Sequence, residues 1–417
     1  MLGSFIRKIV LVFIITSATA QTATEVTPPY NIKTVAFVQN NQNQVPIFKM
    51  GDGFLFQFDD LFGNEANYYY EIVHCDYNWV PSEIPKSEYL QGFDGQRIQD
   101  YTNSVNTLQI YSHYQLTIPN PNTQLRISGN YILKILDENK DVIFSRKFIL
   151  YEDILMIPFQ LKRSRTVNNI EFKHDMEFTI KSKTINFQNP LKNVKVMLLQ
   201  NGQFATAIKN ILPQYTIGND LIYKYDTQTQ FWAGNEFLFF DNNNIRATSN
   251  NVARSDSGSD IYKSFLFTNK ARANYPYSYM QDVNGNFVVR NINATNNDIE
   301  ADYSWVYFSL SAPAFMSAKG IYLAGMFNNY SLTTEYKMDY NAEKNLFEKS
   351  ILMKQGFTNY KYIVADDKGN IDNENAIDGN FWQTENDYSV IVYYCGNNDR
   401  YDRVIGKGNA NSSTITN

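Results

Sequence analysis

The segment from residue 170 to residue 181 alternates apolar and polar side chains, and this constrains the fold more than any other feature of the chain. Successive side chains of a β-strand point to opposite faces, so the pattern predicts a strand with one face in a core and one in water. The inward set is Ile170, Phe172, His174, Met176, Phe178 and Ile180, and the outward set is Glu171, Lys173, Asp175, Glu177, Thr179 and Lys181. We expect His174 to be a hydrogen-bonded core residue and not a metal ligand.

Shorter runs of the same kind recur along the whole chain, with polar turns between them. Asn201-Gly202 and Asn284-Gly285 are dipeptides that favour the positive φ angles of hairpin turns. Aromatic residues make up 15% of the sequence, and aromatic side chains favour strands. We therefore predict an all-β protein of tandem antiparallel β-sandwich domains, of the immunoglobulin or early-set type, with few helices.

The length of 417 residues suggests two or three domains after an N-terminal signal. A hairpin pattern over residues 125–150 closes a first unit, and the alternating segment described above belongs to a second unit. A third set of strands begins near Trp305. The predicted division is a signal peptide at 1–20, an N-terminal sandwich at 21–153, a middle sandwich at 154–300 and a C-terminal sandwich at 301–417.

The first 20 residues have the pattern of a secretory signal peptide. Arg7 and Lys8 precede an apolar run over residues 9–16, which is too short to span a bilayer. Ala18-Thr19-Ala20 offers a cleavage site of small residues, so we expect the mature chain to begin at Gln21. No cysteine follows the site and no later stretch approaches a transmembrane span, which predicts an exported, soluble protein without direct membrane insertion.

Charge and cysteine content exclude several classes of function. A formal net charge of −5 argues against binding to nucleic acids or anionic membranes. Two cysteines, Cys75 and Cys395, cannot form a disulfide framework. They can pair with each other in an oxidising compartment, but two buried free thiols are the favoured alternative.

The densest group of chemically versatile residues is His74-Cys75-Asp76. Neighbours on a strand face opposite ways, so His74 and Cys75 cannot act together as base and nucleophile. Further ligands at metal-binding spacing are missing, and Asp59-Asp60 is expected in a solvated turn. We predict no catalytic residues, no metal and no cofactor. A pocket joining His113 to a carboxylate and a nucleophile would instead favour a hydrolase.

The loop that follows is rich in aromatic residues and is the candidate surface for a protein partner. Its candidate contact residues are Tyr77, Trp79, Tyr89 and Phe93, because amphipathic rings provide contact area on a water-soluble protein. The alternative is that these rings fill the core of the first domain.

The C-terminal unit resembles the early-set sandwich modules that bind glycogen and related glucans. The resemblance lies in residues 324–330 (AGMFNNY) and 356–362 (GFTNYKY). It implies a carbohydrate site around Tyr330 and Lys361, as part of an alternative function as a secreted carbohydrate-binding protein. Tyr330 stands where these modules usually have a tryptophan, and the hairpin around Lys368 lacks the second aromatic residue.

Nearly all of the mature chain resembles the plug proteins of the type IX secretion system of Bacteroidetes. The segments that carry the resemblance are residues 73–79 (VHCDYNW), 88–93 (EYLQGF), 234–237 (GNEF), 354–357 (KQGF), 384–388 (TENDY) and 401–403 (YDR). The resemblance implies a non-enzymatic periplasmic protein that closes the periplasmic mouth of a large outer-membrane β-barrel translocon. That barrel is the implied partner, and the family supplies no catalytic residues.

Overall fold

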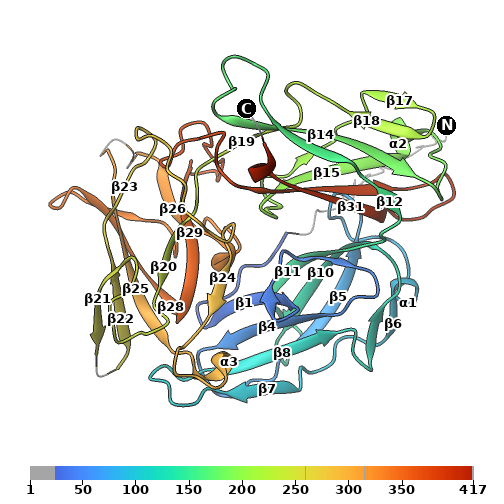
Figure 1. Ribbon diagram of the computed structural model, residues 1–417. Coiled ribbons are helices and arrows are strands. Elements are labelled where there is room, and N and C mark those ends of the chain that lie inside the picture. The colour runs from blue at the N-terminus through green and yellow to red at the C-terminus, as the bar shows by residue number, and fades with distance from the viewer. Residues whose placement is uncertain (1–23, 259, 314–315, 317, 416–417) are drawn as a thin grey trace, which may run out of the picture.

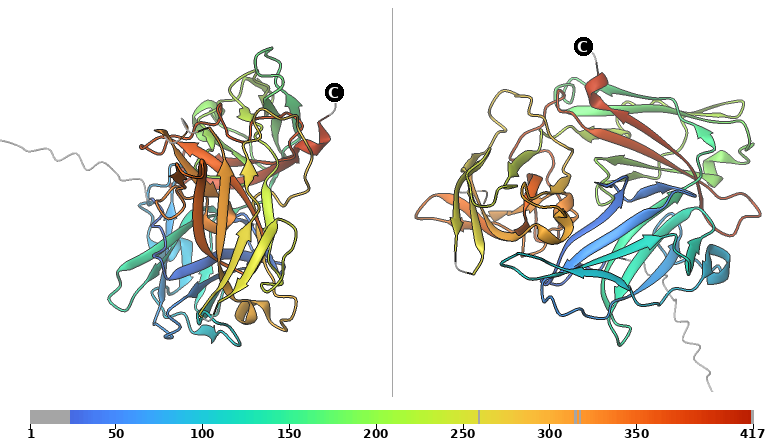
Figure 2. Two further views of the ribbon diagram at one scale, coloured as in Figure 1. Left: turned by 90° about the vertical axis from the view of Figure 1, so that its left-hand side faces the viewer. Right: turned by 60° about the horizontal axis from the view of Figure 1, so that its bottom comes forward.

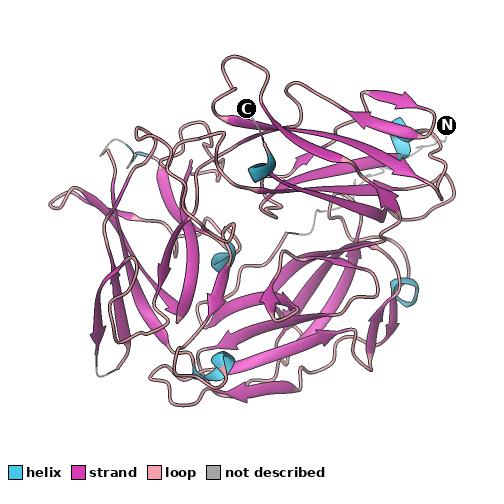
Figure 3. Ribbon diagram, viewed as in Figure 1, coloured by secondary structure: helices cyan, strands magenta, loops and turns pink. Residues whose placement is uncertain are grey.

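The computed structural model describes residues 24–258, 260–313, 316 and 318–415 (Figure 1). The predicted signal peptide lies outside these residues. Strands dominate the described chain, and each of its helices has three or four residues (Figure 3). The prediction of an all-β protein with tandem β-sandwiches and few helices is confirmed.

The first domain, drawn from blue to cyan in Figure 1, is a sandwich of two sheets with strand orders β2-β1-β4-β8-β7 and β3-β11-β10-β5. A small antiparallel pair, β6-β9, lies beside them. Phenylalanine and tyrosine side chains from both sheets fill its core. Its elements are β1 (Ile32–Gln39), β2 (Gln42–Asn43), β3 (Ile47–Lys49), β4 (Phe54–Asp60), β5 (Tyr69–Cys75), α1 (Lys86–Tyr89), β6 (Leu90–Gly92), β7 (Asp100–Asn103), β8 (Ser112–Ile118), β9 (Thr123–Leu125), β10 (Gly129–Leu136) and β11 (Val142–Tyr151).

The second domain packs a sheet built around β14 against a sheet of order β16-β15-β30-β31. Its two C-terminal strands, dark red in Figure 1, lie beside green strands of the middle of the chain. The elements are β12 (Leu155–Met156), β13 (Phe159–Arg163), β14 (Lys173–Ser182), α2 (Pro190–Asn193), β15 (Val194–Gln200), β16 (Ile208–Lys209), β17 (Tyr215–Ile217), β18 (Asp220–Tyr223), β19 (Gln230–Trp232), β30 (Asp387–Tyr394), β31 (Arg403–Asn411) and the 3₁₀ helix η3 (Ser412–Thr414).

The third domain is inserted into the second, between β19 and β30. One sheet has the order β21-β22-β25-β28-β27, and the other is built around β29. Its elements are β20 (Leu238–Asp241), β21 (Val252–Ser257), β22 (Tyr262–Leu266), β23 (Asn269–Lys270), β24 (Phe287–Val289), α3 (Asn297–Glu300), β25 (Tyr303–Ser311), β26 (Gly320–Ala324), the 3₁₀ helix η2 (Met326–Asn328), β27 (Asp339–Asn341), β28 (Leu346–Lys354) and β29 (Gly356–Ala365).

The sheets thus divide the chain differently from the sequential boundaries at 154–300 and 301–417. β30 pairs with β15 from Val194↔Tyr394 to Gln200↔Tyr388, so the last strands of the chain complete the second domain. β20 and β24 pair with β29 and belong to the third domain. The physical reason is that the inward residues of β15 and β30 form one core, and such non-local pairing leaves no trace in local periodicity.

The alternating segment forms β14, which begins at Lys173, so that Ile170 and Phe172 lie exposed before it. Its outward face is less solvated than the pattern predicts. Asp175 is buried and accepts a hydrogen bond of 2.8 Å from the Thr229 hydroxyl. Glu177 is buried between Lys162 and Arg165, each 2.6 Å away. Neighbouring polar side chains thus satisfy both oxygens of Glu177. For Asp175 they satisfy only Oδ1, because its Oδ2 has no hydrogen-bond partner among the described residues.

The three sandwiches occupy the corners of a triangle in Figure 1. The body is narrower in the 90° view of Figure 2, so the three domains lie side by side in one layer and not end to end. No helix of the described chain is long and apolar enough to cross a membrane. The arrangement leaves three interfaces, one between each pair of domains, and a central junction where all three meet.

Candidate functional site at the domain junctions

Three of the four predicted contact residues are buried. Tyr77, Trp79 and Tyr89 expose 1%, 3% and 5% of their surfaces, whereas Phe93 exposes 74%. Tyr89 packs in the core of the first domain. Tyr77 and Trp79 instead fill an apolar core between the first and second domains, with residues such as Met197 and Tyr393 of the second. Of the four predicted contact residues, only Phe93 presents its ring to a partner in this conformation.

The turn of Asp76 places these two rings. The Asp76 carboxylate accepts 2.8 Å hydrogen bonds from the backbone N–H groups of Asn78 and Val80, which closes a tight turn with Trp79 at a φ of 65°. The Tyr77 hydroxyl then donates to the Val196 carbonyl of the second domain at 2.7 Å. The Trp79 ring meets Phe204 edge to face, with centroids 5.5 Å apart. The motif is therefore an interdomain anchor.

His74 and Cys75 are chemically quiet in this setting. Burial lowers the pKa of His74 to about 4, so its ring is neutral, and it packs against the rings of Tyr131 and Tyr401. Burial raises the pKa of Cys75 to about 12, so it remains a thiol. Cys75 and Cys395 are both free. In the described chain, no three His, Cys, Asp or Glu side chains gather in a way that could hold a metal ion.

Asp402, from the end of the chain, ties the same seam together. Its carboxylate accepts a hydrogen bond from the Tyr77 backbone N–H at 3.0 Å. It also forms an ion pair with Lys195 at 2.8 Å. Next to it, Arg403 pairs with Glu152 of the first domain at 2.6 Å. The segments 73–79 and 401–403, which sequence analysis singled out separately, thus meet between the first and second domains.

A buried ionic cluster joins the first and third domains. The expectation of a solvated turn at Asp59-Asp60 is wrong, because both residues lie on β4 and are fully buried. Asp59 contacts His113 Nδ1 at 2.6 Å, Lys354 Nζ at 2.7 Å and the Tyr303 hydroxyl at 2.6 Å. Burial raises the pKa of Asp59, but Lys354 and His113 outweigh it and hold the pKa below its usual value.

The Asp59–His113 pair lacks the third member of a hydrolytic triad. His113 Nε2 is buried and has no hydrogen-bond partner in the described part of the chain. A nucleophile would have to lie at that nitrogen to be activated. The pair is therefore interpreted as a structural contact. The His113 ring orients the Asp59 carboxylate, which forms an ion pair with Lys354.

A second buried carboxylate, Glu236, lies where two linkers cross between the second and third domains. Its Oε1 accepts hydrogen bonds from the Tyr277 hydroxyl and from the Glu385 backbone N–H at 3.1 Å. Its Oε2 has no partner among the described residues. Burial, with smaller contributions from Asp282 and Glu385, raises the pKa of Glu236 to about 7. The segments 234–237 and 384–388 thus meet at this crossing.

The two predicted carbohydrate residues, Tyr330 and Lys361, lie together. Lys361 Nζ lies over the Tyr330 ring, 5.5 Å from its centroid, and over Phe237 at 5.3 Å. The Tyr330 hydroxyl packs beneath the turn at Gly285, where an added Cβ would come within 2.3 Å of it. Lys361 thus lies over the Tyr330 ring, and the carbohydrate site around these two residues stays a prediction.

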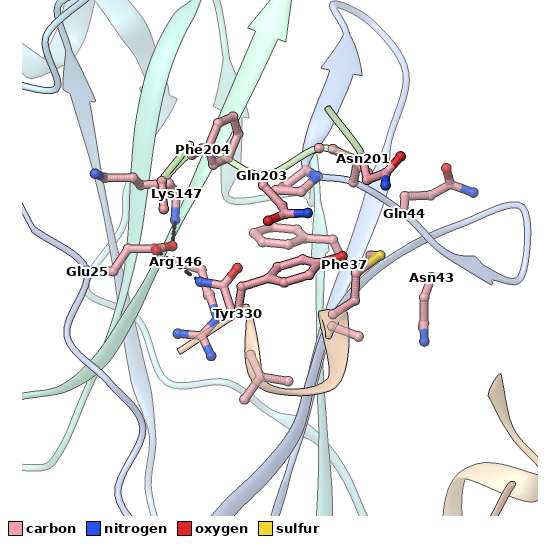
Figure 4. A pocket seen from close by; sticks show the side chains of 18 of the residues that line it. Glu25, Phe37, Asn43, Gln44, Arg146, Lys147, Asn201, Gln203, Phe204 and Tyr330 are labelled. Carbon is pink, nitrogen blue, oxygen red and sulfur yellow. Dashed lines mark hydrogen bonds between the residues drawn. The ribbon is translucent and has the colours of Figure 1, made fainter. Parts of the chain in front are cut away.

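All three domains line a cavity of about 100 Å³ at the central junction (Figure 4). The first domain contributes Phe37, Arg146 and Lys147, and the tail before β1 contributes Glu25. Figure 4 shows Glu25, Arg146 and Tyr330 at one end of the cavity and Asn43, Gln44 and Asn201 at the other. The lining residues from the second and third domains are Asn201, Gly202, Gln203, Phe204, Ala205, Phe287, Met326, Asn329 and Tyr330. Sequence reasoning missed this site because its walls come from distant segments.

Comparisons with known proteins agree with this architecture. Residues 32–152 match the family model described as type 9 secretion system plug protein, first domain. The crystal structure of a hypothetical protein from Parabacteroides merdae ATCC 43184 is similar over 93% of this chain and 98% of its own, with a TM-score of 0.87 and 29% sequence identity. No curated protein matches the chain.

Proposed function

We propose, from the match of residues 32–152 to the family model of the type 9 secretion system plug protein first domain, that this protein binds and seals the periplasmic mouth of the outer-membrane translocon barrel. The family match supports a role in type 9 secretion and is the observation that carries the proposal. Under this proposal the protein is periplasmic, is held at the outer membrane by its partner, and acts by contact without catalysis.

The shape of the body supports a sealing role. A seal over a wide opening needs a broad and rigid surface, since stable interfaces bury about 1,200–2,000 Å² or more. Three sandwiches side by side provide breadth (Figure 2). Buried contacts at each interface, such as Tyr77–Val196 and Asp59–Lys354, resist bending between the domains.

Exposed apolar side chains supply anchors on every domain. Phe62 and Phe93 belong to the first domain, Val167 and Ile217 to the second, and Phe267 and Tyr279 to the third; all are exposed. Residues that become buried near the centre of a protein interface, aromatic ones above all, dominate its energy. Contact is therefore expected to involve more than one domain.

Affinity purification from native outer membranes tests the proposal. Tagged protein expressed from its own promoter should bring down a large outer-membrane β-barrel in near-equal amount. A truncated chain ending at residue 153 should bring down less of that barrel, because only one domain remains for contact. Recovery of the protein without any outer-membrane barrel, under detergents that keep other barrel complexes intact, would contradict binding.

A further inference from the structure

Arg146 occupies a position that the strand pattern reserves for an apolar side chain. On β11, Phe144, Arg146 and Phe148 share one face, and both phenylalanines are completely buried in the core of the first sandwich. Arg146 is half-buried between them, at the wall of the three-domain cavity. A charge on an inward-facing position is costly unless something compensates it, so this departure from the pattern calls for a ligand or a partner.

The protein itself gives Arg146 little compensation. Within the described residues, Arg146 Nη1 donates a hydrogen bond to the Ser145 carbonyl at 3.0 Å. Arg146 forms no ion pair within the described residues. Burial lowers the pKa of Arg146, and the more distant Glu25 and Tyr336 oppose that shift only in part.

Glu25, the carboxylate at the same end of the cavity, is committed to other groups. One of its oxygens accepts from the Lys147 backbone N–H at 2.7 Å and the other accepts from the Asn329 side-chain amide at 3.0 Å (Figure 4). The tail around Glu25 is also fixed by Val26, which exchanges hydrogen bonds with Ser145. Glu25 therefore shapes the cavity, and the guanidinium has no direct counter-ion among the described residues.

The rest of the cavity suits a carboxylate on a short apolar stem. A guanidinium presents parallel N–H donors that match a carboxylate in two-point geometry. Phe37, Phe204 and Met326 offer apolar surface for the stem, and Gln203 an amide. A volume of about 100 Å³ equals the liquid volume of about three water molecules, enough for the end of a glutamate side chain.

We infer that the three-domain cavity is a carboxylate-binding site in which Arg146 receives an acidic side chain of a partner protein. The identity of that partner as the translocon rests on the proposed function. Because the walls come from all three domains, the site exists only in the assembled body. A partner side chain inserted into the cavity therefore binds only when the three domains are packed together, and its binding stabilises that packing.

Sodium propionate is the probe for the site itself, since it reproduces the end of a glutamate side chain. Equilibrium dialysis of the full mature chain with labelled propionate should reveal one saturable site. Propionamide, the neutral analogue, should not compete. Arg146→Gln should weaken propionate binding about tenfold or more, and Arg146→Lys less, because lysine keeps the charge but loses the fork. Arg126→Gln, at an exposed arginine of the same domain, should leave binding unchanged.

The wild-type chain alone can overturn the inference, whether or not a variant folds. Equal binding of propionate and propionamide, or no saturable propionate site, would do so. A retained site in folded Arg146→Gln protein would also do so.

Co-purification with the translocon separates this inference from the proposed function. Wild type and Arg126→Gln should recover the barrel, and Arg146→Gln should recover at least several-fold less. If wild type recovers no barrel, the proposed function fails while the propionate result still stands. If all three recover it equally, the function stands and the role of Arg146 in partner binding is refuted.

Discussion

Asp59 of the first domain and Lys354 of the third form a fully buried ion pair, with 2.7 Å between Lys354 Nζ and Asp59 Oδ2. The two residues are far apart in sequence, and the pair fixes one domain against the other. His113 and Tyr303 hydrogen-bond the same carboxylate, so its charge is satisfied from three sides. Such a pair contributes specificity of docking more than net stability, because both charges lose their hydration.

Removing one member of this pair should be strongly destabilising. Lys354→Met leaves Asp59 buried without its main counter-charge, and we expect a loss of about 3–5 kcal/mol in the free energy of unfolding. Urea denaturation followed by tryptophan fluorescence measures it. Lys49→Met, which removes an exposed ion pair to Asp153, is the matched control and should change little. An equally small effect at both positions would refute the structural role of the buried pair.

The crossing at Glu236 should make stability fall as the pH rises. Burial raises the pKa of Glu236 from its ordinary value of 4.5 to about 7, so the folded protein holds a proton that the unfolded chain releases. The stabilisation is complete below about pH 4.5 and disappears as the pH rises through 7. We expect wild type to lose about 1–2 kcal/mol between pH 5 and pH 8, after allowance for solvent screening.

Glu236→Gln tests that origin. Glutamine keeps the oxygen that accepts from Tyr277 and Glu385, and its amide replaces the titratable oxygen Oε2, which has no partner in the described chain. The variant should show a shallower pH dependence from pH 5 to 8 and greater stability at pH 8. Asp282, whose pKa burial raises to about 6, retains a smaller dependence. Glu343→Gln, at an exposed site, should follow wild type. An unchanged slope in Glu236→Gln would rule out this residue as the source.

Truncation to alanine should destabilise the protein at Trp79 but not at Phe93. Trp79→Ala removes a buried ring from the core between the first and second domains and should cost about 3–5 kcal/mol of stability. Phe93→Ala removes an exposed ring and should leave the unfolding midpoint within error of wild type. Under the proposed function Phe93→Ala should weaken recovery of the translocon. Loss of stability in Phe93→Ala, or none in Trp79→Ala, would show that their burial is misassigned.

The two thiols should differ in reactivity. Cys75 is buried and its pKa is raised to about 12, so it should resist thiol reagents in the native protein. Cys395 is half-buried, and burial with the nearby Asp402 and Asp399 raises its pKa, so it should react slowly. Titration with a chromogenic disulfide reagent should therefore count one thiol natively and two in denaturant. Fast modification of two native thiols would contradict the burial of Cys75.

Local patterns in the sequence were informative about strands and turns but not about how the domains interlock. The alternation before Ser182 identified β14, and Asn284-Gly285 has the positive φ angles expected of its turn. The pairing of β15 with β30 depends on residues far apart, so periodicity could not reveal the insertion of the third domain. Asp59 appeared to belong to a turn because its partners, His113 and Lys354, come from other strands.

For the candidate site too, local sequence features were informative and contacts between distant segments were not predictable. Aromatic content pointed to the loop around Trp79, but burial depends on the second domain, which covers that ring. The sequence does carry one signal for the cavity: Arg146 interrupts the inward face of a strand between Phe144 and Phe148. A charged residue at an inward position of a strand indicates a functional or strained site.

Outer-membrane permeability tests the central claim most directly. The gene is deleted in cells that make the translocon and in cells that lack it, and uptake of a large hydrophilic compound is measured in both. If the protein seals the translocon, deletion should raise uptake only where the translocon is present, and expression of the wild-type chain should reverse the effect. Unchanged uptake after deletion, or an equal rise in cells without the translocon, would contradict the seal.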